Sequence, residues 1–201
     1  MKKTVLCLLA LVLLVSAVSV LPIHGEAVIY DSVIRLHVLA NSDSEEDQNL
    51  KLAVRDAVLA EARVLLADVK TRDAAEAVLA GASDTLQKAA EGVVASAGFD
   101  YPVRVTLGAE EYPTRRYENL AFPAGEYLSL RVLIGEAEGE NWWCVLFPPL
   151  CLSAATAKEE AETAFLAAGL TDEQYRIITD NDSPKYRLRF KILEVAKELF
   201  D

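Results

Sequence analysis

The chain has little of the chemistry that most catalytic and metal-binding sites need. Its 201 residues include two histidines, three cysteines and one methionine. Two histidines exclude a His-rich metal site, and the cysteines lack the spacing of a Cys2His zinc set. The sequence also lacks a G-x-S-x-G elbow, an H-E-x-x-H motif and a glycine-rich phosphate loop. We therefore expect no metal, no cofactor and no catalytic residues.

Positive charge is also scarce. The chain has 20 Lys and Arg residues against 31 Asp and Glu residues, which gives a net charge of −11, and no polybasic patch offsets it. A surface this acidic repels nucleic acid and anionic lipid headgroups. We expect no nucleic-acid partner, and contact with a membrane only through the N-terminal segment.

Charge is almost absent from that N-terminal segment. Lys2 and Lys3 precede an apolar run over residues 5–21, a pattern typical of a Sec-type export signal. Small residues at 17–19 and 25–27 offer cleavage sites, but the run is also close to the roughly 20 residues that a membrane-spanning helix needs. A cleaved signal and an uncleaved anchor both remain open. Both predict that the rest of the chain lies outside the cytoplasmic membrane.

The remaining residues have the length and composition of one globular domain. The whole chain is 52% apolar and 25% charged, and it contains no internal repeat or low-complexity segment. The sequence thus predicts a signal or anchor over residues 1–27 and a single domain over residues 28–201.

The first half of this domain alternates between strand and helix patterns. Residues 33–40 have apolar side chains at every second position, which predicts a strand. A capping signal and an acidic first turn then predict a helix over residues 43–68. A second helix is expected over residues 71–97, with a break at Gly81 and with Gly98 as the residue that ends it.

The second half begins with strand patterns. Alternation predicts strands at 103–107, 126–135 and 142–147, the last two joined as a hairpin by the turn-forming residues between them. Residues 111–125 are expected to form a loop because Pro113 and Pro123 interrupt them.

The C-terminal part is helical at first. Capping signals predict helices after Thr156 and Thr171, with Gly169 between them, then a strand at 186–192 and a short terminal helix. The complete pattern predicts an α+β fold, a small, mainly antiparallel sheet packed with several α-helices.

Two cysteines flank a Pro-Pro turn. Cys144 and Cys151 bracket the sequence VLFPPL, and a turn of this kind can bring two Cα atoms within the roughly 4.4–6.8 Å that a disulfide requires. Thiols outside the membrane tend to oxidise. A Cys144–Cys151 disulfide and a pair of free thiols both stay open. Cys144 with His37 is also the thiol and base pair that an exported thiol hydrolase would use.

Two adjacent tryptophans precede the first of these cysteines. Successive strand residues face opposite ways, so Trp142 and Trp143 cannot both point into one core. Both rings can be covered, or one can lie on a surface where proteins dock, because tryptophan is enriched at such surfaces.

Three segments carry a resemblance to a known family. They are IRLHVLANSDSEEDQNLKLAVRDAVL at 34–59, FPAGEYLSLRVLIGEAEGENWWCVLFPPLC at 122–151, and the closing RFKILEVAKELF. In residues and order they resemble stage II sporulation protein R of endospore-forming bacteria.

The resemblance implies a messenger rather than a catalyst. Family members are made in the forespore and exported into the space between forespore and mother cell. There they trigger a mother-cell membrane protease related to aspartic proteases, which cleaves the inactive precursor of an early mother-cell sigma factor. The resemblance identifies no contact residues.

Six residues of unusual local character are candidate docking residues: Trp142, Trp143, Arg35, His37, Asn41 and Asp43. Two alternatives stay open beside the messenger: the exported thiol hydrolase, and an anchored cell-wall-binding domain.

Overall fold

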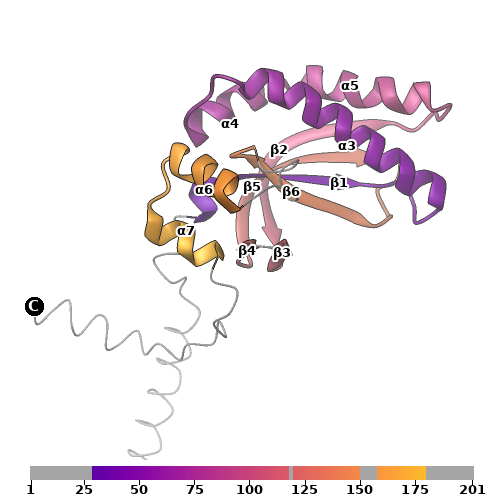
Figure 1. Cartoon of the computed structure of the whole chain (residues 1–201). Helices are drawn as coiled ribbons and strands as arrows, with labels where there is room; N and C mark the ends of the chain where they lie inside the picture. Colours follow the sequence, from indigo (N-terminus) through magenta and orange to yellow (C-terminus); the bar gives the residue numbers. More distant parts are fainter. Residues whose placement is uncertain (1–28, 118–119, 150–157, 180–201) are drawn as a thin grey trace, which may run out of the picture.

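A computed structural model describes residues 29–117, 120–149 and 158–179 (Figure 1). The predicted signal or anchor, and the predicted strand and helix after residue 185, lie outside these residues. Figure 1 shows helices α3, α4 and α5 over one face of a sheet, with strands β3 and β4 on its other side.

The main sheet has four strands in the order β2-β5-β1-β6. Their bounds are β1 Ile34–Leu39, β2 Val103–Tyr112, β5 Gly125–Ile134 and β6 Asn141–Phe147. β1 pairs parallel to β5 and antiparallel to β6, while β2 pairs antiparallel to β5. The α+β class and the mostly antiparallel sheet are therefore confirmed.

The predicted hairpin between β5 and β6 is wrong, because β1 lies between these two strands. The connecting residues cross the end of β1 instead of turning back on β5. The Gly139 amide donates to the Ala40 carbonyl at 3.0 Å, and a Cβ at Gly139 would lie 2.2 Å from the Ser42 carbonyl oxygen. The glycine that suggested a hairpin turn thus permits a close crossing of two loops.

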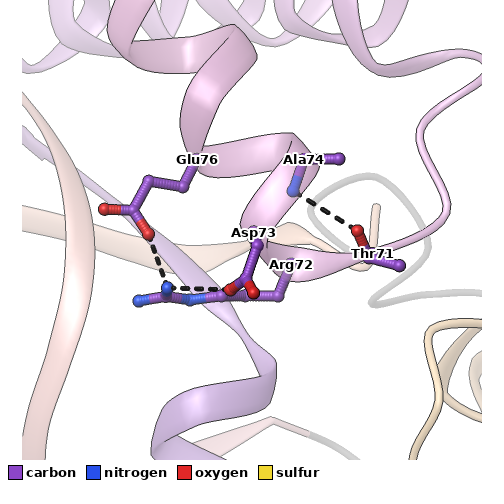
Figure 2. Close-up of polar contacts among 5 residues, drawn as sticks. All are labelled: Thr71, Arg72, Asp73, Ala74 and Glu76. Carbon is purple, nitrogen blue, oxygen red and sulfur yellow. Dashed lines mark hydrogen bonds and ion pairs between the residues drawn. The ribbon is translucent and has the colours of Figure 1, made fainter.

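The helix layer follows the prediction. Its helices are α3 Glu45–Leu66, α4 Arg72–Gly81 and α5 Ser83–Ser96. The break falls after Gly81, and Gly98 has a φ of 83°. The cap of α3 differs from the prediction: the spacing of Ser42 to Glu45 predicts Ser42, but it is the Ser44 hydroxyl that accepts from the Asp47 amide. Figure 2 shows the start of α4, where the Thr71 hydroxyl accepts from the Ala74 amide at 3.3 Å and Arg72 pairs with Asp73 and Glu76.

These helices bury one face of the sheet in what we call the first core. Its strand residues include Ile34, Leu36, Val38, Leu130, Val132 and Ile134, and its helix residues include Leu50, Val54, Val58, Leu79, Leu86 and Ala90. Apolar residues gather on one face of each helix and at every second position of the strands, and these two apolar faces pack together.

The opposite face carries a second core. A hairpin of β3 Arg115–Tyr117 and β4 Leu120–Phe122 contributes to it, as do helices α6 Lys158–Ala167 and α7 Asp172–Thr179. The buried residues of this second core are Ile29, Val33, Tyr112, Phe122, Tyr127, Val145, Phe165, Leu170, Tyr175 and Ile178.

The loop predicted over residues 111–125 is therefore wrong in part. β2 continues to Tyr112, and β3 and β4 pair with each other. Pro113 and Pro123 stand just outside these strands, where neither must donate a ladder hydrogen bond.

Candidate functional site

A line of side chains crosses the sheet on the face away from α3. Strand register places Thr106 of β2 opposite Arg131 of β5, Arg131 opposite His37 of β1, and His37 opposite Trp143 of β6. We call these four residues the polar row. Residues directly opposite one another share a face of the sheet, so four strands each contribute one side chain to one line.

His37 is the centre of this row. Its Nδ1 lies 2.8 Å from Glu110 Oε1, and its Nε2 lies 2.6 Å from Asn141 Oδ1. Its ring stacks on Trp143 with centroids 5.1 Å apart and an interplanar angle of 22°. His37 is only 7% exposed. These contacts fix the imidazole on three sides and orient the indole.

Glu110 adds a negative charge beside the row. Burial raises its pKa, but hydrogen bonds with His37 and Ser129 and the charges of His37 and Arg131 outweigh burial. The net result is a Glu110 pKa below its usual value. The carboxylate is therefore ionised at neutral pH.

Two arginines flank the row. The Arg115 guanidinium lies 3.4 Å from the centroid of the Trp143 ring, a cation–π contact. Arg131 influences Glu110 through its charge. Within the described residues, neither guanidinium forms an ion pair or donates a hydrogen bond to a side chain, and both Nε atoms are buried without a partner.

Arg35, a predicted docking residue, lies beneath this surface. It is 0% exposed and sits among aromatic rings whose centroids are 4.4–6.0 Å away, those of Tyr112, Phe122, Tyr127 and Tyr117. Its Nε donates to the Cys144 carbonyl at 3.0 Å and its Nη2 to the Tyr117 hydroxyl at 2.9 Å. Arg35 thus supports the second core and is not accessible to a partner.

The two tryptophans lie on opposite faces, as strand geometry requires. Trp143 belongs to the polar row, whereas Trp142 packs against the first core. The Arg55 guanidinium covers Trp142 at 4.4 Å from its ring centroid. Both indoles are half-buried and each carries an arginine, so the two rings form separate sites.

Asn41 and Asp43 lie at the end of β1 and organise a loop crossing. Asn41 donates to Asp47 at 2.8 Å and accepts from the Glu136 amide at 3.0 Å. Asp43 accepts from the Glu140 amide at 2.6 Å. Of the six predicted docking residues, only His37 and Trp143 are therefore in contact within the row.

The pairing of Cys144 with His37 is wrong. Cys144 belongs to the first core and His37 points to the other face of the sheet. Cys144 is also disulfide-bonded, which leaves it no thiolate. Cys151 lies outside the described residues, so its pairing with Cys144 stays a prediction. The described residues contain no group of three or more His, Cys, Asp or Glu side chains that could hold a metal ion.

Sequence reasoning missed five residues of this site: Thr106, Glu110, Arg115, Arg131 and Asn141. Arg131 sits in a clear alternating pattern, but only the pairing of β1 with β5 shows that it lies beside His37. The local sequence contains no sign of that pairing, because the two strands are far apart in the chain.

The comparisons with known proteins agree on one family. Residues 30–157 match the family model described as stage II sporulation protein R. This chain belongs to that family. The family's description names a stage of sporulation, and the polar row and Arg115 all lie within the matched residues.

A curated relative supports this membership. Stage II sporulation protein R of Bacillus subtilis (strain 168) is 37% identical over 160 residues, which cover 75% of this chain and 71% of that protein. No solved structure matches the chain. Within the described residues, none of the helices has the length and apolarity to cross a membrane.

Proposed function

We propose that this member of the family is an exported sporulation messenger. It leaves the forespore, acts in the space between forespore and mother cell, and activates a membrane-bound protease that processes the precursor of an early mother-cell sigma factor. The messenger binds and breaks no covalent bond itself.

The observation that supports a binding role best is the setting of Trp143. Its half-buried indole lies between the His37 ring and the Arg115 guanidinium, so its position is fixed before any partner arrives. Tryptophan and arginine are the residues most enriched among those that dominate protein–protein binding energy. A fixed aromatic anchor loses little conformational entropy when it binds.

Activation requires a difference in affinity. A messenger can shift a protease toward its active state only by binding that state more tightly than the idle state. A tenfold to hundredfold shift needs about 1.4–2.8 kcal/mol of differential binding. One well-placed aromatic contact is worth that much.

The test is a reconstitution. The full chain is mixed with the membrane protease in vesicles and with the sigma-factor precursor, and cleavage is followed on gels. We expect cleavage that depends on the messenger. We expect Trp143→Ala to reduce its rate about tenfold or more, and Trp142→Phe to retain most of it because Trp142 lies on the other face.

Two further measurements show whether Trp143→Ala acts by weakening binding or by unfolding the protein. Circular dichroism and urea unfolding show whether Trp143→Ala is folded, and Trp143→Phe, which keeps an aromatic ring beside His37, should recover part of the activity. Equal processing by wild type and folded Trp143→Ala would exclude the row as the docking surface. Cleavage of the precursor by the messenger without the protease would contradict the proposal as a whole.

A further inference from the structure

We infer that the polar row, together with Arg115, is a binding site for the carboxylates of an acidic, extended peptide segment on the partner. This inference rests on the proposed function for the identity of the partner.

The two arginines beside the row form no ion pair within the described residues. Arg115 and Arg131 stand at opposite ends of the His37–Trp143 stack. Among the described residues, neither has a carboxylate partner, although the chain carries more acidic than basic side chains. Glu110 acts on Arg131 only through its charge and is itself hydrogen-bonded to His37, so both half-buried guanidinium groups can still pair with a carboxylate from outside.

The position of Arg115 over Trp143 leaves hydrogen-bond donors of its guanidinium available. A guanidinium that stacks on an aromatic ring keeps the N–H groups at its edge free, because these lie in the plane of the group. The Arg115 Cζ lies over the Trp143 ring, 3.4 Å from its centroid, a distance that suits stacking. Its donors can then bind a carboxylate with two parallel hydrogen bonds, the strongest arrangement that arginine offers.

Buried polar atoms without a hydrogen-bond partner gather on this side of the sheet. Among the described residues, eight buried side-chain atoms have no hydrogen-bond partner, and five belong to residues on this side of the sheet: Arg35, Thr106, Glu110, Arg115 and Arg131. Buried polar groups are normally paired, and a cluster of exceptions at one place is unusual. Three of the five, those of Thr106, Arg115 and Arg131, can donate a hydrogen bond and are in the row or in contact with it, whereas the Glu110 atom is an acceptor that a carboxylate would not satisfy.

A peptide fits these observations better than an anionic membrane does. The chain as a whole has a charge of −11, so a flat anionic surface would be repelled over most of the molecule. A short segment lying along the row is influenced mainly by charges within about 8 Å at physiological salt. The charged groups in contact with the row include the Arg115 and Arg131 guanidinium groups and the Glu110 carboxylate.

The test uses Trp143 as the reporter. The chain has two tryptophans, so Trp142→Phe leaves Trp143 as its single indole. This full-length variant is titrated with acetyl-hexaglutamate amide and, separately, with acetyl-hexaglutamine amide, while tryptophan emission is recorded. We expect a saturable change with the glutamate peptide and at least tenfold weaker binding of the glutamine peptide.

Arginine variants locate the site. In the same background, Arg115→Gln and Arg131→Gln should each weaken binding of the glutamate peptide about tenfold or more, the effect of losing a charge-assisted hydrogen bond. Arg116→Gln is the matched control, because Arg116 is exposed on the same hairpin and should change binding less than about twofold. Circular dichroism of each variant confirms folding.

Several results would overturn the inference. They are equal binding of the two peptides, a loss with Arg116→Gln as large as with Arg115→Gln, or a response to phosphatidylglycerol vesicles as strong as that to the peptide. The processing assay distinguishes this from the proposed function. Normal processing by Arg115→Gln and Arg131→Gln would refute the carboxylate site alone, whereas peptide binding at the row without activated cleavage would refute the messenger role alone.

Discussion

At the scale of single residues, the most constrained group is the His37–Glu110 pair. The two side chains are largely buried, and their atoms are 2.8 Å apart. The pair orients Trp143 through the stacked imidazole, so a hydrogen-bonded pair within the sheet determines the position of a surface residue. Such a pair contributes to stability in a manner that depends on pH.

This dependence gives the first prediction. The pKa of Glu110 is lowered in the folded protein, so its ionised form stabilises the fold above the usual value of 4.5, and this contribution is lost as the pH falls through the lowered pKa. Glu110→Gln should reduce the free energy of unfolding by about 1–2 kcal/mol at neutral pH. The difference from wild type should shrink toward zero on acidification.

Urea unfolding at a series of pH values measures this difference. Glu111→Gln is the control, because Glu111 is the exposed neighbour on the same strand and should show little change at any pH. A gap between wild type and Glu110→Gln that stays constant or widens in acid would contradict the prediction.

At the scale of elements, helix α5 has one glycine in its interior and another just after its C-terminal end. Gly92 lies inside α5, and Gly98 follows the helix with a φ of 83°. An added Cβ meets no atom within 4 Å at either position. The two glycines therefore differ in backbone conformation and not in available space.

An alanine at each position should act in opposite directions. Gly92→Ala should raise the free energy of unfolding by about 0.5–1 kcal/mol, because alanine restricts the unfolded chain and favours helix. Gly98→Ala should lower it by about 1 kcal/mol, because a side chain is strained in the left-handed region. Thermal unfolding of the two single variants tests this pair, and changes of the same sign would refute it.

The elements that the sequence predicted well are those with local signals. Thr71 caps a helix, Gly98 ends one, and Val38 alternates with its neighbours along β1, and all of these depend on residues a few positions apart. The class of the fold follows from such signals. The loop predicted around Pro113 and Pro123 is wrong in part because each proline lies between two strands and not within one.

The arrangement of the strands could not be obtained in this way. The turn residues before Asn141 have the composition of a hairpin turn. The hydrogen bond of Gly139 with Ala40, which carries the chain across β1 instead, joins residues far apart in the sequence. The same limit applies to the site. Trp143 and His37 stood out by type, but their stacking, and the neighbouring Arg131, depend on β1 entering between β5 and β6.

At the scale of the whole molecule, the last described helices are an integral part of the fold. α6 and α7 lie beyond the residues that match the family model, which ends at residue 157. Even so, Phe165 and Ile178 are 0% exposed within the second core. The ring of Phe165 lies 6.1 Å from that of Phe122 and 5.8 Å from that of Tyr175.

A cavity in this core should therefore weaken the entire domain. Phe165→Ala should lower the free energy of unfolding by about 3–5 kcal/mol, the usual cost of removing a buried phenyl ring. Leu166→Ala, at the 38% exposed neighbouring position, should cost well under half of that. Urea unfolding followed by both fluorescence and circular dichroism measures the two variants, and equal losses would show that α6 does not stabilise the sheet.

The strand order also determines when the sheet can form during synthesis of the chain. A ribosome makes β1 early, yet both partners of β1, the strands β5 and β6, are among the last parts of the sheet to be synthesised. The growing polypeptide can form helices α3 to α5 as it emerges, but the middle of its sheet stays open until Phe147 has been added. A sheet that cannot close until its last strand is made keeps the growing chain unfolded for longer, which is compatible with the export that we propose.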